Sequence, residues 1–454
     1  MTKVKTDKKD LFERVPILKA VLSLAIPTVL SQLITVIYNM ADTFYIGQLN
    51  NPDQVAASTI AMPIFMMLTG IANLFGIGGA SLISRSLGKN DKDRAQKSAT
   101  FSIFTGLVIA LVYGLVVLVV CPYVLPVLGT DNSTYDYTKT YLFWTVTIGA
   151  IPTVCSMLLA HLVRAEGYSK HASIGVALGG LLNIALDPLF IFVFNLEIEG
   201  AAIATLISNL ISSIYFIVLL YLRRKSTCII PSPKKFTIKE KIPSEIILVG
   251  LTSFCMAVMG TVSNMVLNGI MASYSNKVVA GMGIAKRIDL IAYAIAHGMT
   301  QGVLPLIAYN YASGNKKRLL DSIKVTTILT LAVSVFATLL LYFGATPVTK
   351  LFIGDAETVR YGKDFLKIIA FACPITAINC IAISVFQAIG KKTQPLILSM
   401  SRKGVTDIPF MFIFNTAIGV GGIPWAVPAA ECVGLAFSII FLGFLIKEIK
   451  KQSL

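Results

Sequence analysis

Apolar residues along this chain gather in long blocks, not in the short alternating runs of half-buried strands. Each block is long enough for a helix to cross the hydrocarbon core of a bilayer, which takes about 20 residues. Twelve blocks can be drawn, at residues 17–41, 55–84, 98–121, 137–160, 171–194, 200–222, 244–272, 278–308, 320–343, 363–387, 394–415 and 423–446. The pattern predicts an all-α integral membrane protein with twelve transmembrane helices. A porin-like barrel is excluded, because its strands have about ten residues and alternate in polarity.

Composition narrows the function classes. The 454 residues are 55% hydrophobic and only 14% charged, whereas a soluble domain carries roughly 25% charged residues. A soluble enzyme is therefore excluded. The sequence has no GxxxxGK[ST], HExxH or GxSxG motif, so we expect neither a nucleotide-driven pump nor an embedded enzyme, and no cofactor. Energy for transport would then come from an ion gradient.

The net charge of +16 indicates an orientation in the membrane. With the N-terminus in the cytoplasm, 29 of the 39 lysines and arginines fall on the cytoplasmic side, in line with the positive-inside rule. Six fall on the opposite side, and four lie within the blocks: Lys286, Arg287, Arg402 and Lys403. Both termini are predicted to be cytoplasmic. The polar N-terminal tail has no small-residue cleavage site, so no removable signal peptide is expected.

The two halves of the chain resemble each other in order and spacing. Shifts of about 221 to 224 residues pair Lys92, Arg94 and Ser98 with Lys316, Arg318 and Ser322, Gly167 with Gly390, and Pro188 with Pro409. We predict an N-lobe at 17–222 and a C-lobe at 244–446, a cytoplasmic linker at 223–243, and cytoplasmic tails at 1–16 and 447–454. Since each half has six crossings, the lobes should be parallel repeats around a central cleft that opens to one membrane face at a time.

Five acidic residues lie well inside the blocks: Asp42, Asp187, Asp289, Asp407 and Glu431. An ionised side chain at the centre of a membrane helix costs on the order of 3 kcal/mol. Each acid therefore needs a partner, a water-filled cavity or a function, and these positions are where we look for a site.

The fifth block places Asn183 and Asp187 four residues apart, on one face of a helix. The two can share one small cation, or the amide can hydrogen-bond a protonated carboxyl. Asp42 ends a first helix that carries Pro27 about four turns earlier, and a proline there gives the helix a place to bend. The alternative is that Asp42 and Asp187 lie near helix ends, solvated or capping, with Asn183 as an interhelical hydrogen bonder.

For the other three acids we ask which partner the sequence offers. For Asp289 an internal ion pair with Lys286 or Arg287 is favoured, and for Asp407 an i,i+4 pair with Lys403. Glu431 has no partner nearby in the sequence. Together with Tyr38, Asp289 and Glu431 are our candidates for contact with a substrate in the cleft.

Five segments add to the pattern of twelve helices in two repeats: Ala25-Ile26-Pro27, Asn39 to Gly47, Ser84 to Gly88, Arg164 to Gly167, and Asn183 to Pro188. With these features the chain resembles the multidrug and toxic compound extrusion (MATE) family of secondary transporters, and within it the bacterial DinF-like and MepA-like branch. The resemblance covers essentially the full chain.

This resemblance implies an antiporter of the bacterial cytoplasmic membrane, through which an organic, often cationic compound leaves the cell while protons or sodium enter. The positions that match the family's cation site are Asp42, Asn183 and Asp187, with Thr205 a weaker match, and sodium would bind there if it is the coupling ion. Pro27 matches the family's bending proline. Another branch of the family uses an acid in the seventh helix, but residues 251–271 contain none, which favours coupling through the N-lobe.

The expected partners are small organic substrates and the lipid bilayer, with no nucleic acid, and we expect a functional monomer. Three other interpretations stay open. A flippase for lipid-linked oligosaccharides or other amphiphiles, from a related helical-bundle family, would line its cleft with basic residues such as the four inside the blocks. A channel suits the repeat and the paired acids less well, and a non-transporting membrane scaffold is the plainest alternative.

Overall fold

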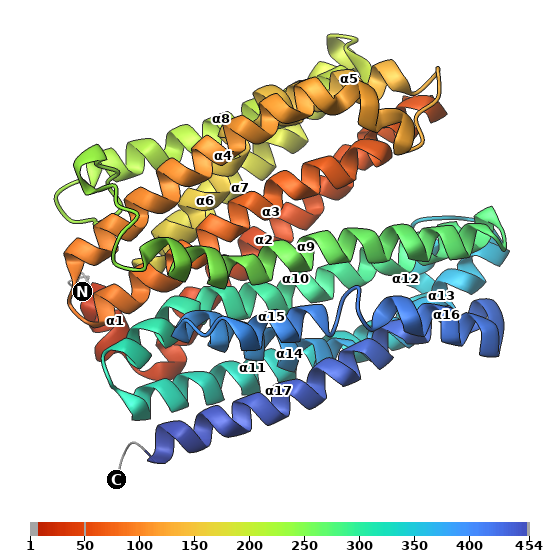
Figure 1. The fold of residues 1–454 in the computed structure, drawn as a ribbon. Helices are drawn as coiled ribbons and strands as arrows, with labels where there is room; N and C mark the ends of the chain where they lie inside the picture. The colour runs from red at the N-terminus through yellow and green to blue at the C-terminus, as the bar shows by residue number, and fades with distance from the viewer. Residues whose placement is uncertain (1–7, 50, 452–454) are drawn as a thin grey trace, which may run out of the picture. The chain divides into compact units, whose positions relative to one another are not determined.

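The computed structural model describes residues 8–49 and 51–451, and these residues form helices and turns without a strand (Figure 1). They divide into two compact units by packing. We call residues 30–254 the N-unit, and residues up to 29 together with those from 255 onward the C-unit. Eleven of the twelve predicted blocks lie on helices or bent helix pairs, and the block at 394–415 is interrupted by a turn at 401–406. Within the described residues, eight helices, or ten spans if each bent pair is one, are long and apolar enough to cross a membrane. The predicted all-α membrane fold class is confirmed.

The N-unit contains six crossings. Its elements are most of α2 (Ile17–Gly47), α3 (Pro52–Gly88), α4 (Lys92–Val127), α5 (Tyr135–Leu142), a π-helical turn (Phe143–Ile148), α6 (Ala150–Ala165), α7 (Ser169–Pro188), a second π-helical turn (Leu189–Val193), α8 (Glu197–Leu222), a 3-10 turn (Pro233–Lys235) and the first part of α9 (Ile242–Ala272). The fourth crossing is a bent pair, in which the helix through Ile148 meets α6 at 52°.

The C-unit repeats this plan. Its elements are α1 (Lys8–Glu13), the first part of α2, the rest of α9, α10 (Asn276–Ala312), α11 (Lys316–Phe343), α12 (Ala345–Lys350), α13 (Ala356–Ala370), α14 (Cys373–Ile389), α15 (Thr393–Met400), α16 (Asp407–Ile418), two 3-10 turns (Gly419–Gly421 and Ile423–Trp425) and α17 (Ala426–Lys451). The fourth crossing is again a bent pair, with α13 and α14 at 47°. The fifth is broken between α15 and α16.

The unit boundaries fall inside two helices, after Val29 in α2 and after Phe254 in α9. Glycines allow the first part of each helix to pack closely on its unit. A Cβ atom on Gly302 of α10 would lie 2.8 Å from the carbonyl oxygen of Leu24, and one on Gly250 of α9 would lie 1.8 Å from that of Leu74. The predicted lobes at 17–222 and 244–446 follow the sequence repeat and stay a prediction, whereas the packing divides the chain within α2 and α9.

Matching helix starts show the repeat in atomic detail. The backbone N–H of Arg94 donates to Asp91 at 2.9 Å, and that of Arg318 donates to Asn315 at 3.1 Å. One turn later, the hydroxyls of Ser98 and Ser322 each donate to the carbonyl oxygen four residues earlier at 2.7 Å. The sequence repeat had paired Arg94 with Arg318 and Ser98 with Ser322 by their spacing. The caps Asp91 and Asn315 lie at matching positions too, and each satisfies a free N–H group at a helix start.

The loops that contain Asp131 and Asp355, one in each half of the chain, are also stabilised in the same way. Asp131 accepts hydrogen bonds from Thr134 and Ser133, which lower the pKa of its carboxyl to about 2. Asp355 accepts from the hydroxyl and backbone N–H of Thr358, and these bonds likewise lower the pKa of Asp355. Hydrogen bonds to the ionised form stabilise it, so both loops are held by a charged cap.

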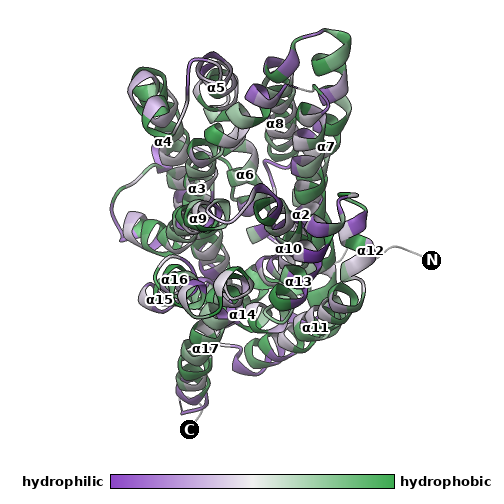
Figure 2. Ribbon diagram, turned by 90° about the vertical axis from the view of Figure 1, so that its right-hand side faces the viewer, coloured by the Kyte–Doolittle hydropathy of each residue, from purple (hydrophilic) through white to green (hydrophobic). Residues whose placement is uncertain are grey.

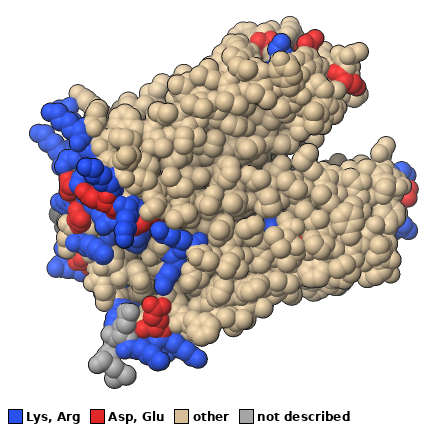
Figure 3. Space-filling model, viewed as in Figure 1, with Lys and Arg blue, Asp and Glu red and all other residues tan. Residues whose placement is uncertain are grey.

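The helix surfaces fit a lipid environment. Seen from one end of the helices, hydrophobic residues predominate on most of them (Figure 2). On α4, for example, Val119 is 69% exposed. Lysines and arginines gather at one end of the helices in each unit (Figure 3). Large apolar side chains exposed along whole helices indicate contact with lipid.

Both terminal segments contain helix, and their assignment as cytoplasmic tails stays a prediction. Within residues 1–16, α1 packs on the C-unit: Phe12 is buried and stacks on Tyr309 with ring centroids 5.0 Å apart. The Arg318 guanidinium holds the same segment by donating to the carbonyl oxygens of Leu11 and Val15. At the other terminus, α17 continues to Lys451. Residues 1–7 and 452–454 of the predicted tails lie outside the described residues.

Candidate cation and substrate sites

Asn183 and Asp187 meet near the C-terminal end of α7, as their spacing predicts. The Asn183 amide donates to Asp187 Oδ1 at 3.1 Å and to the hydroxyl of Thr205, on α8, at 3.3 Å. Asn183 and Asp187 are both buried. Directly after them, Pro188 is followed by the π-helical turn Leu189–Val193. Single π-helical turns occur often at functional sites, and this one changes the helix next to Asp187.

The second acid, Asp42, belongs to the same group. Its charge and that of Asp187 act on each other, and both act on the hydroxyls of Tyr38 and Tyr141. Tyr38, a predicted substrate-contact residue, therefore borders the acids. That Asp42 and Asp187 work together as one cation site stays a prediction.

Three oxygens of this group are buried without a hydrogen-bond partner: Asp42 Oδ1, Asn183 Oδ1 and Asp187 Oδ2. Buried polar atoms in proteins are nearly always paired. In addition, residues 20–84 and 171–222, which include the acid-bearing helices, contain no lysine or arginine. Carboxylate and amide oxygens are ligands for hard cations, so the group can take up a proton or a small metal cation.

No cluster of three or more His, Cys, Asp or Glu side chains that could hold a metal ion occurs in residues 8–49 and 51–451. The candidate group is not of that kind, because an amide oxygen supplies one of its three free acceptors.

Pro27 lies inside α2, ten residues after the helix begins. Because proline has no backbone N–H, the helix lacks the hydrogen bond that residue 27 would donate to Ser23. The boundary between the units follows two residues later, after Val29. The weakest point of α2 thus coincides with the place where its packing changes from one unit to the other.

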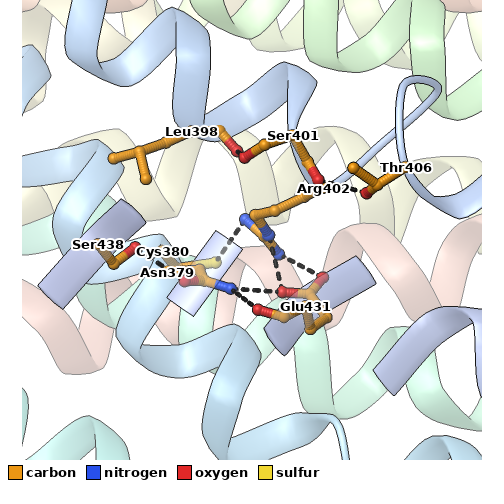
Figure 4. Close-up of polar contacts among 8 residues, drawn as sticks. All are labelled: Asn379, Cys380, Leu398, Ser401, Arg402, Thr406, Glu431 and Ser438. Carbon is orange, nitrogen blue, oxygen red and sulfur yellow. Dashed lines mark hydrogen bonds and ion pairs between the residues drawn. The ribbon is translucent and has the colours of Figure 1, made fainter. Parts of the chain in front are cut away.

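The C-unit holds a different polar cluster, centred on Arg402 (Figure 4). Arg402 donates to both carboxylate oxygens of Glu431, at 2.7 and 2.9 Å. Asn379 also donates to Glu431 at 2.8 Å, and Ser438 donates to Asn379 at 2.8 Å. Arg402 and Glu431 are each 2% exposed. A Cβ atom on Gly434 would lie 2.6 Å from Arg402 Cγ, so glycine there makes room for the arginine.

The other C-unit acids do not form the ion pairs expected from sequence. Lys286 reaches back to Asn264 on α9, at 3.1 Å, and Asp289 accepts from the Cys373 thiol at 3.7 Å. Asp407 accepts from the Ser263 hydroxyl at 2.5 Å and from the backbone N–H of Gly404 at 2.6 Å. The i,i+4 geometry fails for Asp407 because it is the first residue of α16, so Lys403 lies in the preceding turn.

The comparisons with known proteins agree with this architecture. A family model described as MatE matches residues 27–189 and 249–413, more than half of the chain. The chain belongs to the MatE family. It is 32% identical over 443 residues to the multidrug export protein MepA of Staphylococcus haemolyticus (strain JCSC1435), covering 96% of each chain. It is 30% identical over 441 residues to that of Staphylococcus aureus (strain MRSA252), covering 97% of each.

A solved structure described as MATE in complex with MaL6 has the same fold, with a TM-score of 0.92 over 99% of this chain and 100% of that chain, at 24% identity. The resemblance to the MATE family that the sequence indicated is confirmed. Each MatE match begins in the first crossing of a half, α2 or α9, and ends at the fifth, directly after α7 or within α16. The repeat is therefore a property of the family model as well as of this sequence.

Sequence reasoning missed three contacts of this MatE protein. It named Glu431 and, separately, Arg402, without joining them, since 29 residues separate them. A signal was available, because an acid and a cation that both lie inside spans of the same half are costly alone and tend to pair. For the contacts of Asn264 and Ser263 on α9, no comparable signal exists in a single sequence.

Proposed function

We propose that this protein is a secondary active exporter of the bacterial cytoplasmic membrane, which moves organic, often cationic compounds out of the cell in exchange for protons or sodium. Relatives at 30 to 32% identity are named multidrug export proteins. The gathering of lysines and arginines favours cytoplasmic termini. We further propose that the monomer is the working unit and that the coupling cation is its only inorganic requirement.

The observation that carries the proposal is the set of unpaired acceptors on Asp42, Asn183 and Asp187. Two carboxyls held near each other, with no lysine or arginine on their helices between residues 20–84 and 171–222, favour uptake of a cation. A buried group with excess negative charge can bind either the coupling cation or a cationic substrate, and the two would compete for it.

The cycle follows from this competition. When a proton or sodium enters the group from outside, the negative charge that held the substrate is neutralised, and α2 rearranges about Pro27 as the substrate leaves. When the cation is released to the cytoplasm, the group regains its charge and accepts the next substrate. In each step the coupling cation and the cationic substrate replace each other at the acidic group, so the two move in opposite directions across the membrane.

A second candidate is a flippase for lipid-linked oligosaccharides or similar amphiphiles. One observation favours it: Lys286, Arg287 and Lys403 lie within spans of the C-unit, where they could hold a phosphate headgroup. The unpaired acids of the N-unit have no role in that function, so we place it second.

The test is transport in proteoliposomes with proton and sodium gradients imposed separately. With rhodamine 123 as the cationic probe, we expect accumulation against its own gradient when one of the two cations flows the other way, and loss of accumulation when an ionophore removes that cation gradient. Dye movement that ignores both gradients, together with lipid transfer between leaflets, would instead identify the flippase.

A further inference from the structure

A cavity of about 430 Å³ lies within the N-unit, away from the acids described above. Its lining residues come from the last third of α4, from α5 and the π-helical turn after it, and from the first turn of α8. They include Leu118 of α4, Phe143 and Trp144 of the π-helical turn, and Glu199 of α8. No residue of the candidate cation group lines this cavity, so it is a separate feature of the N-unit.

Two aromatic rings meet at a steep angle in the wall of the cavity. The rings of Phe143 and Trp144 have centroids 5.5 Å apart and planes inclined at 77°. The indole N–H of Trp144 donates to Glu199 Oε1 at 2.8 Å, which holds the larger ring in place. The face of an aromatic ring attracts cations, and rings set at an angle form the aromatic cages that bind quaternary ammonium groups.

The cavity also carries unbalanced negative charge. Glu199 is half-buried, and within residues 8–49 and 51–451 it accepts from the neutral indole but forms no ion pair. Asp136 and Lys139 line the cavity too, but both are exposed and lie three residues apart on α5. Their opposite charges offset each other and are screened by solvent. Glu199 therefore leaves one negative charge next to the two rings.

The C-unit places a cation of its own at the matching position. The shift of 224 residues that pairs the helix starts and the capped loops of the two halves also pairs Leu118 with Tyr342 and Phe143 with Lys367. The Lys367 ammonium lies over the ring of Tyr342, 4.9 Å from its centroid. In the N-unit an aromatic ring replaces this lysine, and the space between the two corresponding helices stays open.

We propose that the cavity bounded by Phe143, Trp144 and Glu199 binds a quaternary ammonium group or a similar organic cation. The rings attract the cation through their faces, and the carboxylate supplies the opposite charge. The site lies outside the candidate cation group and does not depend on the proposed export function. Two sources carry a quaternary ammonium group: a dissolved organic cation and the choline headgroup of a lipid.

The fluorescence of Trp144 gives a direct test. The chain has two tryptophans, so Trp425→Phe leaves Trp144 as the only tryptophan and as a reporter inside the cavity. The full protein in dodecyl maltoside is titrated with benzyltrimethylammonium, which does not absorb where tryptophan is excited. We expect the emission of Trp144 to change and to saturate. A change that never saturates, as for free tryptophan in solution, overturns the site.

Two variants in this Trp425→Phe protein separate the charge from the ring. Glu199→Gln keeps an acceptor for the indole and removes the charge, and the dissociation constant should rise about tenfold. Phe143→Leu keeps an apolar side chain and removes a ring, and the constant should rise about threefold. Dissociation constants that stay unchanged in both variants overturn the site.

Two matched controls locate the binding. Glu197→Gln removes the same charge two residues earlier on α8, where the carboxylate contacts Gln54 at 2.5 Å, and should leave the constant within about twofold. Asp187→Asn changes the candidate cation group and should leave the constant unchanged. If either control raises the constant as much as Glu199→Gln does, the probe binds elsewhere and the cavity site is wrong. The export function is tested by transport and is not affected by these results.

Competition by short-chain lipids distinguishes the two sources. Dihexanoyl-phosphatidylcholine carries a quaternary ammonium group, and dihexanoyl-phosphatidylethanolamine carries a primary one. If only the choline lipid weakens binding of the probe, and Glu199→Gln removes that effect, the occupant is a lipid headgroup. If neither lipid competes, the occupant is a dissolved organic cation. Equal competition by both lipids overturns the assignment to a quaternary ammonium group.

Discussion

The N-unit and the C-unit share a plan of six crossings but treat buried charge in opposite ways. In the N-unit, Asp42 and Asp187 keep carboxylate oxygens without a partner. In the C-unit, Glu431 has both oxygens bound by Arg402, and Asn379 adds a further donor. The same helical framework thus carries one set of acids that lacks a cation and one acid that already has its own.

Whether its buried acids already have a cationic partner determines which unit can respond to an ion gradient. An acid whose partner is a covalently attached arginine cannot exchange that partner for a proton or sodium without leaving a buried charge uncompensated, which costs several kcal/mol. The acids of the N-unit have no such partner. We therefore expect cation exchange in the N-unit and a fixed, structural pair in the C-unit.

The largest effect is expected for Asp187→Asn. The substitution keeps the shape of the side chain and removes its charge, so cation-driven dye accumulation should fall to the level of protein-free vesicles. The matched control is Asp136→Asn in α5, an exposed residue, which should transport at the unsubstituted rate. Cation-driven accumulation by Asp187→Asn at the unsubstituted rate would remove the N-unit from the coupling mechanism.

Removing one partner of the C-unit pair should damage stability. Arg402→Met leaves Glu431 buried and unpaired, at a cost of about 3–5 kcal/mol, whereas adding Glu431→Leu should recover most of it. Thermal unfolding of the purified protein in detergent measures both. For comparison, Arg94→Met breaks a partly exposed pair with Glu245 and should cost less than about 1 kcal/mol. If the double variant is no more stable than Arg402→Met, the loss of stability does not come from an unpaired Glu431 charge, and this explanation of the pair is wrong.

Pro27→Ala should slow turnover without loss of stability. Proline inside a helix costs about 3 kcal/mol relative to alanine, so the variant should unfold at the same temperature or higher while its rate of dye export drops severalfold. Pro63→Ala is the control, because Pro63 also lies inside a helix, α3, but not at a unit boundary. Equal export rates for the two variants would rule out bending at Pro27.

The smallest effect is expected for Thr205→Val. The valine removes the acceptor that the Asn183 amide reaches at 3.3 Å, a hydrogen bond worth about 1 kcal/mol. The cation concentration that gives half-maximal exchange should rise about fivefold, and Thr205→Ser should restore it. A rise with serine as large as that with valine would assign the effect to the methyl group of the threonine.

Hydropathy predicted the crossings well, because lipid demands long apolar helices whatever their packing. The i,i+4 contact of Asn183 with Asp187 was also predictable, since helix geometry alone brings the two side chains together. The break between α15 and α16 was not predicted, although the polar stretch from Ser401 to Asp407 interrupts the block at 394–415. Its charged residues were interpreted as buried within one continuous span instead of as the signal of a break.

Contacts between distant segments were the other failure. Arg402 with Glu431, and Ser263 with Asp407, depend on which helices are neighbours, and one sequence does not contain that information. The helix α1 was missed for a related reason, because Phe12 gains its burial only from Tyr309 and its surroundings on α10.

The central claim is that cation and substrate compete for the acids of the N-unit. It is tested most directly by the dissociation constant of rhodamine 123 for the protein in nanodiscs, measured at equilibrium over a series of pH values and sodium concentrations. Binding linkage is reciprocal, so the account predicts that affinity falls as one of these cations is raised, and that Asp187→Asn shows no such dependence. An affinity that stays constant for the unsubstituted protein across both series would contradict the account.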